Sequence, residues 1–221
     1  MRTGPLLSSI LLAAALGLAG AVLAQGSAEP YAVSVWARVL FGPDGKPAEY
    51  ALVDEGKYPV KFAENVKARV ARASVPAPQV EGRAVTLRTG VELRFLITPS
   101  AEGGSVRTQG IAMGPLPVTR YFASYPKDVG RSAGWEGRAS AVCTVGIGGR
   151  CTHIDVTALP GVPESVRRYM KASLEQWEFE PQQVDGKPIE GEYRLTLDFS
   201  TLDSSPENFR EDKFLRLLRG R

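Results

Sequence analysis

Residues 176–199 read QWEFEPQQVDGKPIEGEYRLTLDF, and their pattern carries the clearest signal for the fold. Its last part alternates, with apolar Tyr193, Leu195, Leu197 and Phe199 set against polar Glu192, Arg194, Thr196 and Asp198. A period of two predicts a strand with one buried face. Asp185-Gly186 predicts a tight turn before it, because both residue types tolerate positive φ.

The residues upstream predict a helix that precedes this strand. Val166, Met170, Leu174 and Trp177 form one apolar stripe at helical spacing. Trp177 and Phe179 bring large apolar area to the point where helix gives way to strand, and Pro181 is expected to stop the helix. Two alternating stretches, about 138–145 and 150–157, predict a hairpin before the helix.

A shift of 104 positions superimposes this pattern on an earlier part of the chain. Gly45 falls on Gly149, each in a predicted hairpin turn, and Pro59 falls on Pro163, each just ahead of a helical pattern. Val80-Glu81-Gly82-Arg83 falls on Val184-Asp185-Gly186-Lys187. The earlier part then has strands at about 34–41 and 48–53, a helix with Phe62, Val66 and Val70, and a last strand with Val91, Leu93 and Phe95. A fixed offset of this kind indicates an internal repeat.

The expected fold class is therefore α+β, with two tandem β-β-α-β modules. Each module is expected to be a three-stranded antiparallel sheet with one helix packed on it. We expect the modules at 25–97 and 125–200. Residues 98–124, rich in Gly and Pro, are predicted to be a linker with at most a short strand, and residues 201–221 a tail, expected to be helical, that packs on its own domain or touches a membrane or partner.

Cys143 and Cys151 flank a turn that contains three glycines, and they are the chain's two cysteines. We expect a three-residue loop at 146–148 to set them opposite each other in a disulfide, which contributes about 2–3 kcal/mol on the chain-entropy estimate. A metal site that combines both cysteines with His153 is the alternative, and it lacks a fourth obvious ligand.

Several spaced elements of the second copy together resemble the C-terminal domain of the TonB family of energy transducers. They are Tyr125-Pro126, Gly134-Trp135-Glu136-Gly137, Gly148-Gly149, Trp177-Glu178-Phe179-Glu180-Pro181 and Asp185-Gly186-Lys187-Pro188. The resemblance covers about 125–199, and the first copy, about 33–97, lacks the Tyr-Pro and Trp-x-Phe elements. A structural role is enough to explain each of these motif residues, so the motif indicates a fold and does not by itself mark a site. Pro126 is expected in a short helix or lead-in over 125–131.

The resemblance implies a binding function rather than catalysis. Such domains dock outer-membrane receptors by pairing a sheet edge with an extended receptor segment. The strand carried over for this role comprises Glu192, Tyr193, Arg194, Leu195, Thr196 and Leu197. The 16 prolines are scattered, without the long Pro-rich spacer of a full transducer, so we expect docking without a spacer's reach. A homodimer is a further outcome for the same edge.

Residues 1–24 have one basic residue, Arg2, followed by an apolar stretch that ends Val22-Leu23-Ala24. This is typical of a secretory signal peptide cut before Gln25, and it predicts a periplasmic protein. An uncleaved inner-membrane anchor is the alternative, and then the leader alone would contact the membrane.

The remaining composition argues against other classes. Removal of the leader leaves 26 basic against 24 acidic residues, and from Pro206 onward five basic residues face three acidic ones, so the body is neutral. Nucleic-acid binding would need a dense basic face. We expect no cofactor and no enzymatic activity. A hydrolase that uses acidic residues such as Asp155 and Glu164, or a small-ligand module, is the alternative, without a supporting motif.

Overall fold

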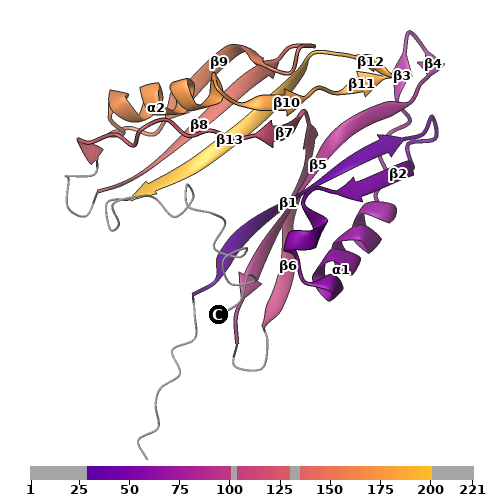
Figure 1. The fold of residues 1–221 in the computed structure, drawn as a ribbon, viewed down its shortest axis with the longest axis horizontal. Helices are drawn as coiled ribbons and strands as arrows, with labels where there is room; N and C mark the ends of the chain where they lie inside the picture. Colours follow the sequence, from indigo (N-terminus) through magenta and orange to yellow (C-terminus); the bar gives the residue numbers. More distant parts are fainter. Residues whose placement is uncertain (1–28, 101–103, 130–134, 201–221) are drawn as a thin grey trace, which may run out of the picture.

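The computed structural model describes residues 29–100, 104–129 and 135–200. Within them the chain is a mixed α+β structure of mostly antiparallel strands with two α-helices (Figure 1). The expected α+β class is confirmed. The leader at 1–24 and the tail at 201–221 lie outside the described residues.

The first half forms a sheet with a helix on one face. Its elements are β1 (Tyr31–Phe41), β2 (Pro47–Leu52), the 3-10 turn η1 (Glu55–Lys57), α1 (Val60–Ala71), β3 (Gln79–Val80), β4 (Arg83–Ala84) and β5 (Leu87–Thr98). Alternate residues of β1 and β5 point toward α1 and form the core: Val33, Val35, Ala37, Val39, Phe41, Val91, Leu93, Phe95 and Ile97. Each valine, leucine, isoleucine or phenylalanine among them contributes about 1.5–3 kcal/mol on full burial.

The second half forms a three-stranded antiparallel sheet in the order β13-β8-β9. Its elements are β8 (Glu136–Val145), β9 (Cys151–Ala158), α2 (Glu164–Leu174), β10 (Glu178–Glu180), β11 (Gln183–Val184), β12 (Lys187–Pro188) and β13 (Gly191–Ser200). Its core is richer in aromatic rings, with Trp177, Tyr169, Phe179, Tyr193 and Phe199 all buried.

The two halves have the same strand register at the expected shift of 104. Ala37 pairs with Leu52 and Ala141 with Val156, and every other β1–β2 pair has its β8–β9 counterpart, including one bulge at the same place. The predicted turn glycines also match, since Gly45 has a φ of 76° and Gly149 a φ of 73°. Asp185 and Gly186, with φ of 46° and 77°, form the predicted positive-φ pair, as Glu81 and Gly82 do in the first half.

Residues 98–124 are more than a linker. They contain β6 (Ser105–Gly114), which pairs with β5 from Gly90 to Thr98, and β7 (Leu116–Thr119), which pairs with β10. Glycines and prolines concealed these strands in the sequence, because Gly110 and Gly114 interrupt the apolar alternation. The strands form because long-range partners satisfy their backbone groups.

The first sheet also exceeds the expected three strands, and two residues fall outside the predicted helix. The β11–β12 hairpin pairs with the start of β5, so this sheet has six strands. Helix α2 ends at Leu174, so Trp177 lies beyond it, and Pro181 follows β10 rather than stopping the helix. The pairing of β10 with β7 draws the chain into extended conformation before Pro181 is reached. Pro126 lies in an irregular segment just before a turn at 127–128, which makes it a lead-in.

Candidate protein-binding edge

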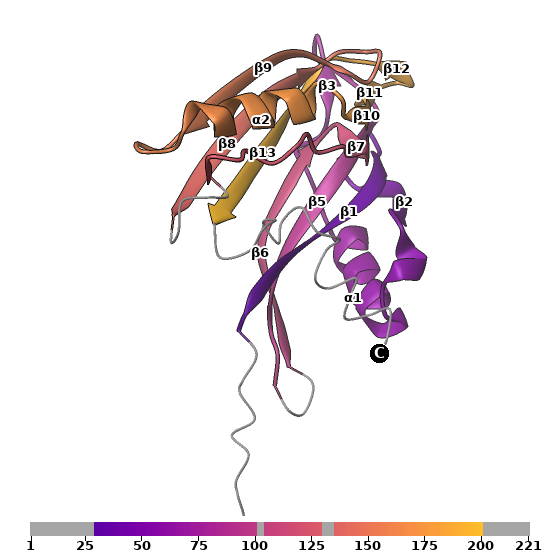
Figure 2. The same ribbon diagram turned by 60° about the vertical axis from the view of Figure 1, so that its left-hand side comes forward.

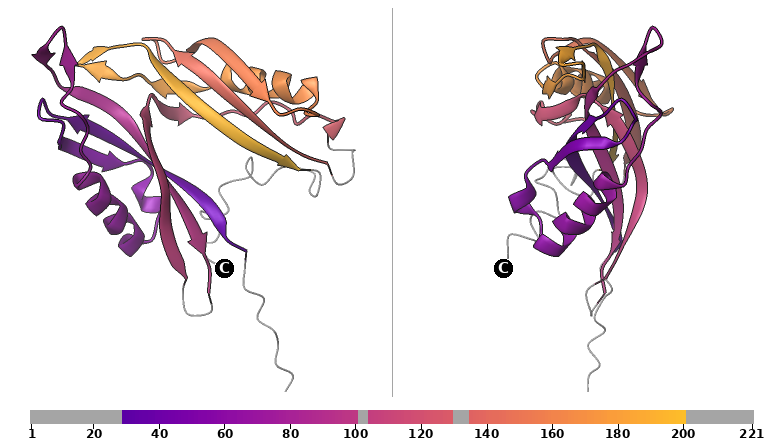
Figure 3. Two further views of the ribbon diagram at one scale, coloured as in Figure 1. Left: turned by 180° about the vertical axis from the view of Figure 1, so that it is seen from behind. Right: turned by 90° about the vertical axis from the view of Figure 1, so that its right-hand side faces the viewer.

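The predicted binding strand β13 is an outermost strand of its sheet. It pairs with β8 over its whole length, from Gly191 with Val145 to Ser200 with Glu136. In the described part of the chain no further strand pairs with its other edge, and Glu192–Leu197 make no other backbone–backbone hydrogen bond. β13 and β6 meet at one end and diverge toward the other (Figures 1 and 3).

The side chains of β13 alternate as the sequence predicts. Tyr193 and Leu197 are buried against the α2 core and Leu195 is half-buried, whereas Glu192, Arg194 and Thr196 are exposed. Burial, together with the nearby Glu92 carboxylate, raises the pKa of the Tyr193 hydroxyl. The backbone of this strand is therefore held in place by its own core.

The exposed face of β13 is already balanced in charge. Arg194 forms an ion pair with Glu192 at 2.8 Å, and the Thr196 hydroxyl lies 2.9 Å from that of Ser140. Neighbouring Arg138 contacts Asp198 at 2.5 Å. A face of this kind offers little charge selectivity to any segment that approaches it.

The first half closes one end of this edge. A Cβ on Gly114, the last residue of β6, would lie 2.9 Å from the backbone oxygen of Glu192. The Trp36 ring of β1 lies 6.1 Å from the Tyr193 ring, measured between centroids. The accessible part of the edge therefore begins after Tyr193, which shortens the predicted site at its start.

The other motif residues have structural roles. Trp177 is 1% exposed, donates a hydrogen bond from Nε1 to the Tyr121 carbonyl at 2.7 Å, and packs against Tyr193 and Phe179. Tyr125 stacks on Phe199 at 6.3 Å. Gly137 leaves room for the Trp135 ring, because a Cβ there would lie 2.5 Å from it. Pro126 is buried, and Gly186 completes its turn.

The Cys143–Cys151 disulfide is present, but the two residues are not directly opposite. Cys143 faces Ile154 and Cys151 faces Val145, and their Cα atoms are 5.6 Å apart. The loop spans 146–150, and a bulge at Thr152 turns Cys151 onto the core face beside Cys143. The extra residue of a bulge reverses which side chains face the core beyond it. The predicted three-residue loop at 146–148 did not include this bulge.

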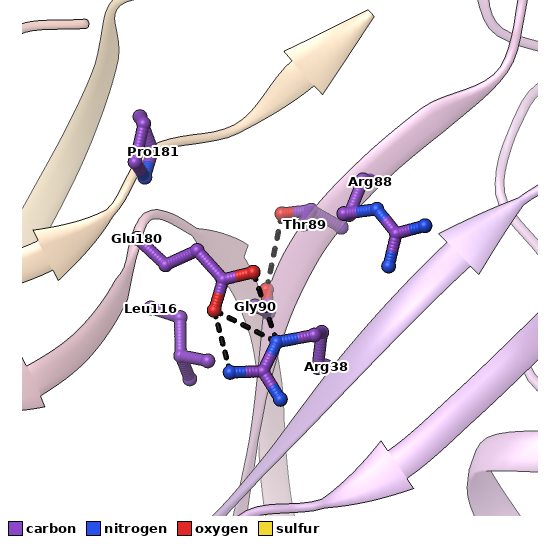
Figure 4. Close-up of a pocket in the computed structure, with 7 residues that line it drawn as sticks. All are labelled: Arg38, Arg88, Thr89, Gly90, Leu116, Glu180 and Pro181. Carbon is purple, nitrogen blue, oxygen red and sulfur yellow. Dashed lines mark hydrogen bonds and ion pairs between the residues drawn. The ribbon is translucent and has the colours of Figure 1, made fainter. Parts of the chain in front are cut away.

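A polar contact between the halves was not predicted. The Arg38 guanidinium donates hydrogen bonds to both carboxylate oxygens of Glu180, with Nε at 2.9 and 2.7 Å (Figure 4). Buried Thr89 donates to the Gly114 carbonyl at 3.1 Å and accepts from Gln182 at 2.9 Å. The space lined by these residues has no room for a water molecule, so it is an interface and not a ligand site. No sequence signal marks the contacts of Thr89 with Gln182 or of Glu180 with Arg38, because each joins residues more than 90 positions apart.

The residues of the alternative hypotheses do not come together. Asp155 lies on the face of β9 away from α2, whereas Glu164 begins α2. The disulfide uses both cysteine sulfurs that a site with His153 would need. Across the described ranges, no group of three or more His, Cys, Asp or Glu residues is placed to hold a metal ion. No helix in those same ranges is long and apolar enough to span a membrane.

Comparison with models of known protein families gives no match to this chain, and no curated protein matches its sequence.

Proposed function

We propose that this chain is a cell-envelope protein-binding domain that docks an extended segment of a partner on the outer edge of β13. The observation that carries the proposal is the difference between β13 and its counterpart β5. Strand β5 is paired on both edges, by β1 on one side and by β6 and β11 on the other, whereas β13 pairs with β8 alone among the described strands.

Edge pairing supplies affinity through main-chain hydrogen bonds and selectivity through alternate side chains. From Arg194 to Leu197 the backbone is fixed by burial of Leu197 and by full pairing with β8. A preorganised edge loses little conformational entropy when a partner strand is added. Arg194 and Thr196 would contact alternate side chains of that strand, and Leu195 would contact those on the α2 side.

The proposed architecture is two tandem β-β-α-β modules, the first a degenerate copy of the second. The shared register, the shared bulge and the matching positive-φ residues support it. The proposed family is the TonB C-terminal domain, because the motif residues occupy positions that a sheet-and-helix unit of this kind requires. The proposed partner class is a TonB-dependent outer-membrane receptor, the proposed location is the periplasm, and the proposed role is binding without catalysis.

The test is titration of the isotopically labelled protein with a synthetic peptide that copies the extended periplasmic segment of such a receptor. We expect amide signals of 194–197 to shift or broaden. Adjacent N–H groups of a strand point to opposite edges, so one of Arg194→Pro and Leu195→Pro keeps the pairing with β8. That folded variant should lose binding, while Thr196→Ala, which alters only a side chain, should bind within about twofold. Binding that survives the folded proline variant contradicts edge pairing.

A further inference from the structure

The second sheet has another outer strand, and a groove runs beside it. Strand β9 lies at the end of the order β13-β8-β9, and α2 lies next to it (Figure 2). The groove between them has a volume of about 190 Å³. Ile154 and Val156 of β9 form its apolar floor, and Glu164, Arg167, Arg168 and Lys171 of α2 form its rim.

The rim carries more positive charge than its neighbours balance. Glu164 lies 3.6 Å from Arg167, and Arg167 also donates a hydrogen bond to the Val156 carbonyl at 3.1 Å. Asp128, whose pKa is lowered chiefly by its hydrogen bond from Ser165 and less by Arg168, lies beyond the rim. Lys171 is exposed and has no ion pair within the described residues. At least one cation of the rim is therefore available to a ligand.

The first half shows that the fold does not require these cations. At the shift of 104, Tyr50 and Leu52 replace the floor residues, and the rim becomes Val60, Ala63, Glu64 and Lys67. The single cation of that rim, Lys67, forms an ion pair with Glu55 at 2.6 Å. The same sheet-and-helix packing thus forms with a neutral rim. Packing of α2 on its sheet therefore does not explain why the rim of the second half is basic.

We propose that this groove binds an extended acidic peptide segment of a partner protein as an added strand on β9. Main-chain groups of the peptide pair with the β9 edge, and its apolar side chains contact Ile154 and Val156. Because side chains alternate along a strand, its carboxylates reach Arg168 and Lys171 from the same face. The peptide N–H groups take over the Val156 carbonyl, which releases Arg167 to meet a further carboxylate.

Charge complementarity selects this occupant over others. Two-fold pairing of β9 with β9 from a second copy would bring two basic rims together, which is unfavourable. Residues 206–221 carry five basic against three acidic residues, so they do not supply an acidic segment. The inference goes beyond the proposed function, because β9 and β13 are opposite edges of one sheet.

The probe is a fluorescent peptide, acetyl-(Thr-Glu-Thr-Val) repeated twice, which places Glu and Val on one face of a strand. We expect amide shifts confined to 151–158 and 164–171, and binding that weakens as salt is raised. The same peptide with Lys for Glu should not bind. Two further versions are N-methylated, one at the threonines and one at the Glu and Val residues, so each blocks one edge of the peptide. The version blocked on the edge that faces β9 should bind at least tenfold more weakly than the other, because it lacks the main-chain donors.

On the protein, Arg168→Glu with Lys171→Glu should weaken binding at least fivefold. Lys61→Glu with Arg72→Glu, two exposed positions on the α1 side, changes net charge equally and should have no more than a twofold effect. Arg168→Gln with Lys171→Gln provides a second measurement that perturbs the helix less. Circular dichroism and an intact disulfide show that each variant is folded.

Four results would overturn the proposal. They are equal binding by the Arg168→Glu, Lys171→Glu variant and the Lys61→Glu, Arg72→Glu control, equal binding of both N-methylated peptides and the unmethylated one, shifts at 194–197 instead of 151–158, and binding of anionic phospholipid vesicles at these residues without peptide binding. Shifts at 194–197 with this acidic probe would still leave the β13 proposal standing, so the two proposals fail separately.

Discussion

The two halves of this protein share a backbone plan and differ in what surrounds it. Strand pairs, bulge and turn glycines coincide at a shift of 104, and Val75 and Phe179 each donate a backbone hydrogen bond to the carbonyl of their turn glycine. The surroundings differ in one respect. Strand β5 is paired on both of its edges, whereas among the described residues β13 is paired only on the edge that faces β8. The register alone therefore does not decide which edge is available.

The hairpin between the helix and the last strand shows how sequence directs a shared element to different uses. The β11–β12 hairpin pairs with β5, and the Asp185 carboxylate accepts from the Thr86 backbone N–H at 2.8 Å and contacts Arg83 at 2.9 Å. Its counterpart β3–β4 pairs only within itself. The position of Gln182 is Pro78 in that copy, so the donor to Thr89 has no equivalent there.

The largest predicted effect concerns the cores. Trp177→Ala should lower the free energy of unfolding by about 3–5 kcal/mol, because it removes a fully buried ring and leaves a cavity. Val75→Ala, at the counterpart of Phe179, should cost about 1 kcal/mol since its side chain is only half-buried. Urea unfolding measures both. Equal losses would mean that the aromatic core of the second half is not its main source of stability.

Removing the disulfide should have the next largest effect. Reduction of the wild-type chain should lower the free energy of unfolding by about 2–3 kcal/mol, since the bond closes a short loop in the unfolded state. A Cys143→Ala, Cys151→Ala variant serves as the control and should not respond to reductant. The first half has Val39 and Pro47 at these positions, so amide exchange there should change less than in β8 and β9.

Gly114→Ala tests the contact that closes one end of β13. The new Cβ would lie 2.9 Å from the Glu192 oxygen, so we expect a cost of about 1–3 kcal/mol from the forced shift. Gly110→Ala on the same strand is the matched control, because nothing lies within 4 Å of its Cβ. Its effect should stay within about 0.5 kcal/mol. If the two variants behave alike, the halves are not in close backbone contact at this point.

The smallest predicted effect is a pH dependence of stability that comes from the β11–β12 hairpin, which pairs with β5. The Thr86 backbone N–H, and next the Arg83 guanidinium, lower the pKa of the Asp185 carboxyl. Because the folded-state pKa lies below the unfolded value of about 3.9, the contribution to stability is present above that pH and is lost as the pH falls through the folded pKa. Asp185→Asn should therefore flatten the decline in urea midpoint between about pH 4 and pH 2. Glu81→Gln in the exposed hairpin is the control, and an identical profile would contradict the assignment.

Residues with local signals were predicted well. Alternation in 192–199, the turn pairs at 81–82 and 185–186, and the helix starts after Pro59 and Pro163 all appear in the structure. The predictions that were wrong depended on distant partners. Residues 98–124 form β6 and β7 because β5 and β10 pair with them, and Trp177 leaves the helix because β10 is drawn to β7. The contacts of Arg38 and Thr89 likewise join residues from different halves.

Local sequence was enough to predict the strands, helices and turns of the repeated units, since periodicity and positive φ are properties of neighbouring residues; it was not enough for β6, β7 or the end of α2. It also determined which cysteines pair, because they are the only two and flank one turn. Which strand edges are covered depends on the tertiary structure, and so does the place where the basic rim of α2 meets the apolar side of β9. Backbone groups accept any strand that reaches them, so edge occupancy follows from the path of the whole chain rather than from side-chain pattern.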